Sequence, residues 1–338
     1  MPHHELWFSA DGKVDERRDP EAMRILLALG GNALLRRGEP ASEPNQRRNV
    51  ETAAAAVATL AAEHELIVTH GNGPQVGLLA LQNESFADVP PYPLDVLDAE
   101  SEGMVGHMLE LALRNALPDR DVVSVLTQVV VAEDDPAFRR PSKPIGPVYD
   151  ERQARELRFE RGWTIGRDGG GYRRLVPSPE PRAIAEIRSL RALVGSGALV
   201  VCAGGGGIPV AMDGLGTLHG VEAVIDKDLT AALLARRLDA DMLLMLTDVD
   251  AVHADWGGPR QHPLAHVTPH ELRELDFAAG SMGPKVEAAC RFVEATGRQA
   301  AIGALGDAVR VARGGAGTQV LASVSEPASA AARRLPRR

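Results

Sequence analysis

Short, nearly continuous apolar runs recur along the chain and alternate with helical stretches. They lack the every-second-residue polar pattern of a strand that is exposed on one face. A strand that is apolar on both faces suits a parallel sheet covered by helices on both sides. We therefore predict an α/β fold, a three-layer α/β/α sandwich with an open, mainly parallel sheet. The predicted strands are Arg24–Leu29, Glu65–Thr69, Val122–Val131, Ala198–Ala203, Asp241–Thr247 and Ala300–Leu305.

Helical patterns fill the intervals between these runs. Thr268-Pro269-His270-Glu271 has the pattern of a capping box, which marks the start of a further short helix. The longer predicted helices are Gln46–Glu63, Asp98–Asn115, Pro181–Val194, Asp228–Arg237 and Pro284–Thr296.

Residues 132–176 break the alternation. They are rich in charge, Pro and Gly, with one short helix at Asp150–Glu160 and a hairpin from Trp163 to Leu175. We interpret the segment as a small subdomain that protrudes from the sheet, with a plain solvated excursion of the surface as the alternative. The chain then divides into a loosely ordered N-terminal extension (1–22), an α/β domain (23–325) and a basic C-terminal tail (326–338).

Composition narrows the functional classes. The 338 residues include 37 Lys and Arg against 46 Asp and Glu, a net charge of −9, which argues against a nucleic-acid or anionic-membrane binder. Hydrophobic residues make up 44%, enough for a sizeable core. No apolar run is long enough to span a bilayer, and the first residues lack the apolar centre of a secretory signal. Two cysteines, Cys202 and Cys290, exclude a disulfide scaffold, so we expect a cytoplasmic protein without nucleic-acid or membrane partners.

Four glycine-rich turns lie along the chain, and three of them directly follow predicted strands. In open parallel sheets, ligands bind at the turns after the carboxyl ends of the strands. Glycine lets backbone N–H groups approach an anion, and the next helix adds the positive end of its dipole. We interpret these as phosphate-binding turns in preference to turns that serve packing alone. They are Gly30-Gly31-Asn32, Gly71-Asn72-Gly73-Pro74, Gly204-Gly205-Gly206-Gly207 and Gly280-Ser281-Met282-Gly283-Pro284-Lys285.

Spacing excludes several common sites. No turn reads G-x-x-x-x-G-K-[ST], and the turn at Gly71 has its last glycine one place too late for a dinucleotide fingerprint. No G-x-S-x-G elbow is present. Three histidines spaced by four resemble ligands on one helix face, but prolines interrupt any helix there, so we assign no metal to them. They are His262, His266 and His270.

Lysine is scarce, and only three lysines follow residue 13. Lys143, Lys227 and Lys285 each lie in a turn bounded by Pro and Gly or flanked by acids. Compact ammonium groups suit the charge of a transferred phosphoryl group, where catalysis is mainly positioning and electrostatic stabilisation. Several cations together need an acid between them, which Asp228, and Asp226 as a second candidate, would supply. Solvated surface lysines are the alternative.

The predicted strand 241–247 ends in acids. Asp248 and Asp250 follow it directly. Carboxylates at the carboxyl end of a strand contact a ribose or metal-bound water in some proteins and cap a turn in others. Both interpretations stay open on the residues alone.

In these motifs the chain resembles the carbamate kinases of the amino acid kinase family. The matching segments run in the family's order from about residue 24 to 320. Three of them together separate the carbamate kinases from relatives that act on acetylglutamate, aspartate or uridylate: THGNGPQVG, GGGGIPV and GSMGPK. The other matches are LALGGNALLRRGE, DVLDAESEGMVGHML, PSKPIGPVY, GVEAVIDKDLTAALLA and LLMLTDVDAVH.

The resemblance implies a homodimer with a mobile protruding subdomain near residues 132–176. It implies reversible phosphoryl transfer between ATP and carbamate, giving ADP and carbamoyl phosphate, with Mg²⁺ accompanying the nucleotide. In arginine breakdown the reaction typically runs toward ATP. No side-chain nucleophile is needed, because the carbamate oxygen attacks directly in line.

The resemblance also assigns catalytic roles to individual positions. Lys143 is similar to the lysine that closes over the transferring group from the protruding subdomain. Lys227 and Lys285 resemble the pair that contacts the nucleotide phosphates and the transition state. Asp228 resembles the acid that organises the lysines.

Binding roles follow in the same way. The positions that match the cradle for carbamate and the transferred phosphoryl group are Gly30, Gly31, Asn32, Gly71, Asn72 and Gly73. Those that match a second cradle are Gly204, Gly205, Gly206 and Gly207. Those that match the nucleotide pocket are Asp248, Asp250, His253 and Gly283.

Two positions depart from the expected pattern. Glu102 stands where S-Q-G-M would place Gln, and an acid pointing toward an anionic substrate would weaken its binding. His253 stands where a Tyr is common, which changes the contact on the adenine side. Two other functions stay open: a kinase of this family acting on a different small acid, and a non-catalytic nucleotide-binding regulator.

Overall fold

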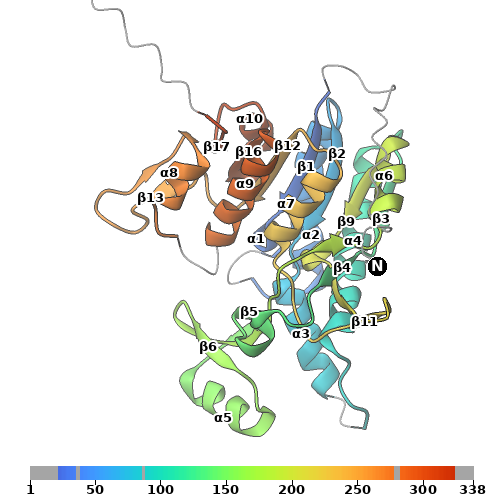
Figure 1. Cartoon of the computed structure of the whole chain (residues 1–338), viewed down its shortest axis with the longest axis vertical. Coiled ribbons are helices and arrows are strands. Elements are labelled where there is room, and N and C mark those ends of the chain that lie inside the picture. The colour runs from blue at the N-terminus through green and yellow to red at the C-terminus, as the bar shows by residue number, and fades with distance from the viewer. Residues whose placement is uncertain (1–21, 36–38, 86–87, 278–281, 324–338) are drawn as a thin grey trace, which may run out of the picture.

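The computed structural model describes residues 22–35, 39–85, 88–277 and 282–323. Apart from Ala22, the predicted extension 1–22 lies outside these residues, as does the predicted tail 326–338. An eight-stranded sheet in the order β15-β17-β16-β12-β1-β2-β9-β3 forms the centre of the molecule (Figure 1). Its strands are β1 (Arg24–Leu29), β2 (Glu65–His70), β3 (Val122–Val125), β9 (Leu199–Cys202), β12 (Met242–Thr247), β15 (His266–Val267), β16 (Gln299–Ala304) and β17 (Thr318–Val320).

Neighbouring strands of this sheet are parallel, except for the antiparallel pair β16 and β17. The strands are apolar on both faces, and alternate residues of β1 enter different cores. Leu26 and Ala28 pack with residues of α6, α7 and α9, whereas Ile25 and Leu27 pack with residues of α2, α4 and α10. Helices therefore cover both faces, and the predicted three-layer sandwich is confirmed.

The helices lie close to the predicted ranges. Thr268 accepts a hydrogen bond from the backbone N–H of Glu271 in the predicted capping box. The helices of the layers and of the connections are α1 (Gly31–Leu34), α2 (Glu43–Ala61), α3 (Gly73–Ser85), α4 (Leu94–Ala116), α6 (Ile187–Gly195), α7 (Lys227–Arg237), α8 (Pro269–Arg273), α9 (Met282–Thr296) and α10 (Ala308–Ala312). Among the described residues, none of the helices combines the length and the apolar character that crossing a membrane requires.

One predicted strand and one predicted helix were wrong in extent. The run Val122–Val131 forms two strands, because the chain leaves the main sheet after β3 and continues as β4 (Gln128–Val131) in a second sheet. At this break the hydroxyl of Thr127 accepts a hydrogen bond from the backbone N–H of Ala203. The first residues of the predicted helix 181–194 pair with β4 as β8 (Ala183–Ile184), so that α6 begins only at Ile187.

The second sheet has the order β11-β10-β4-β8 and includes the hairpin of β10 (Ile208–Met212) and β11 (Leu218–Gly220). A smaller hairpin joins β13 (His253–Ala254) to β14 (His262–Pro263). Both follow glycine-rich or acidic turns at the ends of main-sheet strands, and they add surface beside those turns.

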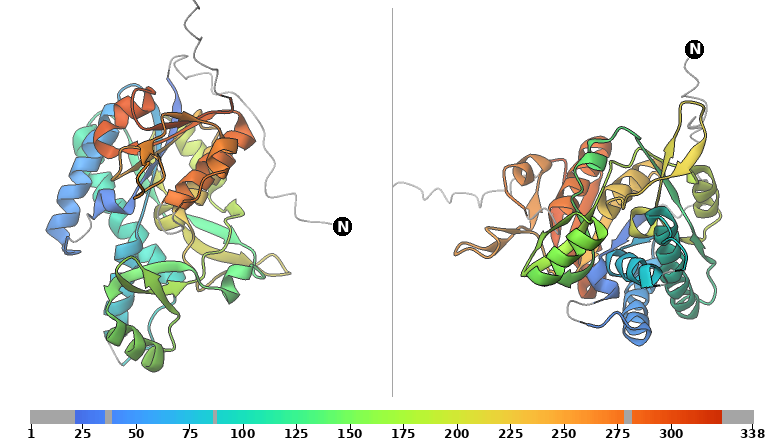
Figure 2. Two further views of the ribbon diagram at one scale, coloured as in Figure 1. Left: turned by 90° about the vertical axis from the view of Figure 1, so that its left-hand side faces the viewer. Right: turned by 90° about the horizontal axis from the view of Figure 1, so that it is seen from below.

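A third sheet, β5-β7-β6, stands apart from the main sheet together with α5 (Figures 1 and 2). Its elements are β5 (Lys143–Tyr149), α5 (Glu151–Arg161), β6 (Ile165–Asp168) and β7 (Gly171–Val176). We call residues 143–176 the protruding subdomain. The predicted helix and hairpin are both present, with β6 and β7 antiparallel.

The protruding subdomain meets the rest of the protein through a backbone contact between α3 and β5. A Cβ atom on Gly77 would lie only 1.9 Å from the Cα of Gly146. Gly146 itself has a φ of 73°, in the region that favours glycine. Two glycines therefore allow β5 to lie directly against α3, which places the first residue of β5, Lys143, toward the main sheet.

Candidate active site

The glycine turns meet at one edge of the main sheet. β1 pairs in register with both neighbours at its end, Leu29 opposite His70 and opposite Leu246, so the turns that follow start at the same level. A Cβ on Gly71 would lie 2.9 Å from the backbone nitrogen of Gly31 and 3.3 Å from Cε of Lys227. The first two turns therefore touch each other and the side chain of a predicted catalytic lysine.

The turn after β9 joins the same place. Gly205, Gly206 and Gly207 have φ values of 72°, 110° and 85°, which only glycine adopts without strain. A Cβ on Gly205 would lie 2.1 Å from the side chain of Asn72, and one on Gly206 would lie 2.5 Å from the carbonyl oxygen of Ile225. This turn thus fits between the Gly71 turn and the start of α7, where no larger residue has room.

The lysines meet around two buried aspartates. Lys227 Nζ lies 2.5 Å from Oδ1 of Asp228, and Lys285 Nζ lies 3.1 Å from Oδ2 of the same carboxylate. Lys143 Nζ, from the protruding subdomain, lies 2.5 Å from Oδ2 of Asp226. Three ammonium groups from three distant parts of the sequence therefore converge on acids that are two residues apart.

Local structure explains how the acids are held. Asp226 is the N-cap of α7, and its Oδ1 accepts hydrogen bonds from the backbone N–H groups of Asp228 at 2.9 Å and Leu229 at 3.3 Å. Such a cap satisfies N–H groups that have no partner inside the helix. The side chains of Lys227 and Asp228 then project from a fixed first turn, beside the Gly206 backbone.

Burial and charge shift the protonation of this cluster in opposite directions. Burial lowers the pKa of Lys227 to about 8, with Lys285 adding to the decrease and Asp228 opposing it. Burial alone would raise the pKa of Asp228, but the ammonium groups of Lys227 and Lys285 outweigh it and hold that pKa well below its usual range. Asp228 is thus a permanent anion between two cations, one of which loses its proton in mildly alkaline solution.

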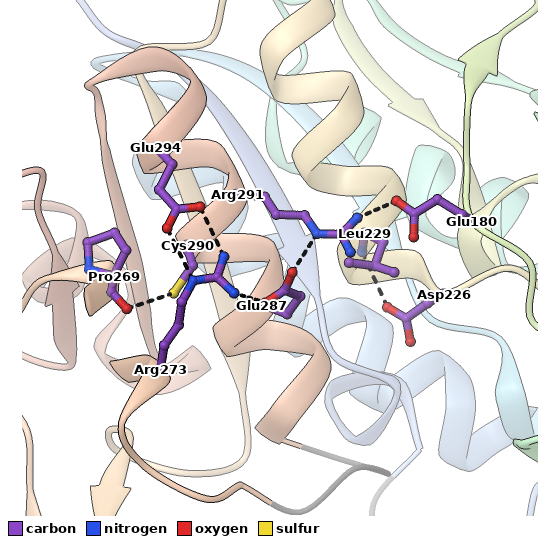
Figure 3. Close-up of polar contacts among 9 residues, drawn as sticks. All are labelled: Glu180, Asp226, Leu229, Pro269, Arg273, Glu287, Cys290, Arg291 and Glu294. Carbon is purple, nitrogen blue, oxygen red and sulfur yellow. Dashed lines mark hydrogen bonds and ion pairs between the residues drawn. The ribbon is translucent and has the colours of Figure 1, made fainter. Parts of the chain in front are cut away.

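Helix α9 carries Lys285 and is fixed from its outer side (Figure 3). Arg273 of α8 forms ion pairs of 3.0 Å with both Glu287 and Glu294 of α9. Arg291 of α9 pairs with Glu287 and with Glu180, which lies in the segment that leaves the protruding subdomain. The position of α9 is therefore tied to α8 and to the connection of the protruding subdomain.

A second buried polar group lies under the glycine turns. The side-chain amide of Asn72 donates to Asp98 at 3.2 Å and to Ser101 at 2.7 Å, both on α4. Burial raises the pKa of Asp98 well above its usual range, although the hydrogen bond from Asn72 opposes this. These contacts fix the orientation of Asn72 from below.

Glu102 does not project as a free acid. Its Oε1 accepts a hydrogen bond from the backbone N–H of Gly204 at 2.9 Å, and its Oε2 accepts one from Thr127 at 3.2 Å. Burial raises its pKa to about 8, opposed by these two hydrogen bonds. Glu102, which stands where the family pattern has Gln, therefore supports the first residue of the glycine turn after β9.

Three of the residues predicted to contact the nucleotide, Asp248, Asp250 and His253, follow β12. His253 Nε2 lies 2.8 Å from Oδ1 of Asp250, and the His253 ring has an edge contact with Trp256 at a centroid distance of 5.3 Å. These contacts hold the β13–β14 hairpin together. Asp248 accepts a hydrogen bond from Thr247 at the end of β12, and Gly283 lies in the first turn of α9 with Lys285.

Some predicted positions lie partly outside the described residues. Gly30 and Gly31 lie at the start of α1, but the side chain of Asn32 is not among the described groups. Gly280 and Ser281 of the fourth glycine turn are also outside them. Gly73 begins α3, directly after the Gly71 turn.

No metal-ligand set is present in the part of the chain that the structure describes. There, no three His, Cys, Asp or Glu side chains gather as they would around a metal ion. Both oxygens of Asp228 already contact lysines. The three histidines spaced by four are exposed and belong to β14, β15 and α8. The described residues therefore do not fit a metal held by the protein alone.

Sequence reasoning missed the partner of Lys143 and the role of Glu102. Asp226 was only a second candidate for the acid among the cations, and the motif Ile225-Asp226-Lys227-Asp228 carried the signal. An aspartate directly before a predicted helix is a common N-cap, so its position at the start of α7 could have been found. Nothing in the sequence pairs it with a lysine that is 83 residues away.

Comparison with known proteins agrees with this geometry. The model of the amino acid kinase family matches residues 23–304, and the chain belongs to this family. It is 53% identical over 299 residues to the carbamate kinase of Haemophilus influenzae, covering 88% of this chain and 96% of that protein. It is 50% identical over 294 residues to the carbamate kinase of Escherichia coli K12, covering 87% and 98%.

Solved structures give the same result. The carbamate kinase of Giardia lamblia bound to AMP-PNP superposes with a TM-score of 0.81 at 38% identity, covering 89% of this chain and 98% of that one. The structure of the same enzyme bound to citric acid gives a TM-score of 0.84. The resemblance predicted from the sequence motifs is thus confirmed over most of the chain.

Proposed function

We propose that this protein is a carbamate kinase that transfers a phosphoryl group reversibly between ATP and carbamate, giving ADP and carbamoyl phosphate. The observation that carries the proposal is the convergence of Lys143, Lys227 and Lys285 on Asp226 and Asp228, beside glycine turns of main-sheet strands. Identities of 50–53% to carbamate kinases over nearly their whole length support the choice of substrate.

The chemistry needs positioning and charge from the protein. The carbamate oxygen attacks the terminal phosphorus of ATP in line, the bond to the bridging oxygen breaks, and ADP leaves. Negative charge on the transferring oxygens is stabilised by the ammonium groups of Lys143, Lys227 and Lys285. At about 4 Å and an effective dielectric constant of about 20, each such contact contributes about 4 kcal/mol before desolvation.

The glycine turns complete the site. The N–H groups of Gly30 and Gly71 already donate to the carbonyl oxygens of Leu246 and Leu29. The first N–H groups of α1 and α3, which begin at Gly31 and Gly73, would therefore bind carbamate and the transferred phosphoryl group. The turn Gly204–Gly207 would form the second cradle. Asp248, Asp250, His253 and Gly283 would contact the nucleotide. Anion binding by such backbone groups needs no side-chain charge, which leaves the lysines for the transition state.

Several finer features belong to the same proposal. Mg²⁺ would be held by nucleotide oxygens and water, as it commonly is when few carboxylates are free. We also propose that the protein is a cytoplasmic homodimer that makes ATP from carbamoyl phosphate during arginine breakdown, and that the protruding subdomain moves as a lid that excludes water.

A coupled assay tests the function. Purified protein supplied with carbamoyl phosphate, ADP and Mg²⁺ should form ATP, measured through hexokinase and glucose-6-phosphate dehydrogenase. Folded Lys227→Ala protein is the matched control. Acetyl phosphate and N-acetylglutamyl phosphate, offered in parallel, should support far slower ATP formation. No ATP above the control, or a preference for another acyl phosphate, would refute the assignment.

A further inference from the structure

Asp226 makes contacts of two different kinds with its two oxygens. Oδ1 accepts the backbone N–H groups of Asp228 and Leu229 and so caps α7, as the close-up of Leu229 shows (Figure 3). Oδ2 lies 2.5 Å from Nζ of Lys143. Asp226 itself is only 7% exposed, so its carboxylate is largely shielded from water.

These contacts link the protruding subdomain to α7, in addition to the apolar contacts of Ile145 and Val176 with residues of α3 and α4. Lys143 is the first residue of β5, in the protruding subdomain. Asp228 and Lys227 lie in the first turn of α7, under the main sheet's glycine turns, and Asp228 also binds Lys285 of α9. A single carboxylate therefore lies between the lysine of the protruding subdomain and the two lysines of the main body.

The balance of charges in the cluster explains why Lys143 needs Asp226. Three ammonium groups face two carboxylates, and Asp228 is already shared by Lys227 and Lys285. Without the charge on Asp226, Lys143 would face only cations and one shared acid. Its side chain is 28% exposed, against 12% for each of the other two lysines, so it has a free path into solvent. Repulsion would then favour a Lys143 that points away from the site.

We propose that Asp226 is a positioning residue that docks Lys143 of the protruding subdomain at the reaction centre while it caps α7. The side chain of Asp226 then determines both where Lys143 binds and how Lys227 and Asp228 are oriented. A phosphoryl group that arrives meets Lys143 already held near its place, which lowers the cost of bringing a third cation to the site. The inference rests on the proposed function for its effect on turnover.

The substitution Asp226→Asn separates the two contacts. Asparagine caps a helix about as well as aspartate, so α7 keeps its first turn. It carries no charge, so the pair with Lys143 is lost. The double-mutant cycle with Lys143→Met then measures whether the two residues act through each other.

We expect Asp226→Asn to lower kcat about tenfold when Lys143 is present and less than twofold in the Lys143→Met background, a coupling of about 1.0–1.4 kcal/mol. The thermal midpoint of Asp226→Asn should stay within about 2 °C of the wild type, because the cap is kept. An equal loss of kcat in both backgrounds, or a large fall in the midpoint that accounts for the loss, would overturn the proposal.

A second measurement does not depend on turnover. Limited proteolysis within residues 142–177 of the ligand-free protein should be severalfold faster in Asp226→Asn, equally fast in Lys143→Met, and no faster in the double variant. Proteolysis at the wild-type rate in Asp226→Asn would overturn the docking role. If the wild type forms no ATP from carbamoyl phosphate, the proposed function fails, while this proteolysis cycle still decides whether Asp226 docks the subdomain.

Discussion

The strands of the main sheet are buried on both faces, whereas few residues of the protruding subdomain are buried. All six residues of β12 are buried, but only Ala154 is buried in the eleven residues of α5. α5 is instead lined with exposed ion pairs such as Arg155 with Glu151. Nevertheless each region supplies at least one lysine to the same cluster.

This difference indicates that the two regions contribute to the site in different ways. Lys227 projects from a capped helix that packs on the buried strands of the main sheet, so its position is fixed by the core. Lys143 projects from a small sheet whose Ile145 and Val176 pack with apolar residues of α3 and α4. The same sheet meets the body through the contact of Gly77 with Gly146 and through Asp226. We infer that the body sets the geometry of the reaction, and that the protruding subdomain brings a cation to it. The predictions below test this contrast.

We expect the largest effect on kcat from a substitution of Lys227, on α7 of the main body. Lys227→Ala should lower kcat by several hundred-fold or more, by analogy with the roughly 10³-fold or larger effect of a charge-stabilising arginine finger. Steady-state kinetics in the coupled assay measures it. Lys143→Ala should cost a smaller factor, and Arg155→Ala, which removes an exposed cation from α5, should leave kcat unchanged. A kcat within twofold of the wild type would remove Lys227 from the reaction.

The next largest effect should come from changing the contact between Gly77 of α3 and Gly146 of β5. In Gly77→Ala the new methyl group would overlap the backbone of Gly146, so either the protein loses about 1–3 kcal/mol of stability or β5 moves away from α3. Urea unfolding measures the first outcome and faster proteolysis of the subdomain the second. Gly103→Ala on α4 is the matched control, since its Cβ would meet only a Leu126 methyl group at 3.8 Å. Wild-type behaviour of Gly77→Ala on both measures would refute the contact.

The charge state of the body lysine predicts a pH dependence. Because burial lowers the pKa of Lys227 to about 8, kcat/KM should fall about tenfold per pH unit above that value, as the free enzyme loses the ammonium form. The pH profile of Lys227→Arg, whose guanidinium stays charged, should lack this decrease even though its activity is lower.

The buried acid Glu102 also titrates in this range, since its pKa is raised to about 8. Glu102→Gln therefore serves as the control for the pH profile and should keep the alkaline decrease. If the decrease disappears in Glu102→Gln and persists in Lys227→Arg, then Glu102 is the group responsible.

We expect the smallest effects, on the stability of α5 alone, from substitutions on the surface of the protruding subdomain. Asp150 caps α5 in a capping box with Gln153, so Asp150→Ala should destabilise this helix by about 1 kcal/mol. Arg155→Ala removes only an exposed ion pair with Glu151 and should destabilise the helix much less than Asp150→Ala does. Hydrogen exchange of the α5 amides measures both. An Arg155→Ala effect larger than that of Asp150→Ala would contradict this order.

The sequence predicted the body of the fold well because burial on both faces leaves a plain pattern. The strand Arg24–Leu29 was predicted to the residue, and Asp241–Thr247 to within one. The run 122–131 misled because two strands of different sheets follow each other with only Leu126 and Thr127 between them. Apolar content shows that both are buried, but it does not show that the chain changes sheet.

The candidate site was predictable as a set of residue types and only in part as a geometry. Glycines after strands and scarce lysines in turns indicated the members, because anion binding restricts which residues serve. The pairing of Lys143 with Asp226, and that of Glu102 with the Gly204 amide, depends on how distant segments pack. Such contacts leave no local pattern in a single sequence.

Both cysteines of the protein lie in the core. Cys202 and Cys290 are at most 1% exposed, and burial raises the pKa of both thiols, that of Cys290 to about 11. Neither would react readily with a maleimide dye while the protein is folded. Cysteines introduced at the exposed positions Phe159 of α5 and Ala55 of α2 would therefore be labelled without background. Fluorescence transfer between them would show directly in solution whether the protruding subdomain changes its distance from α2 when substrates bind.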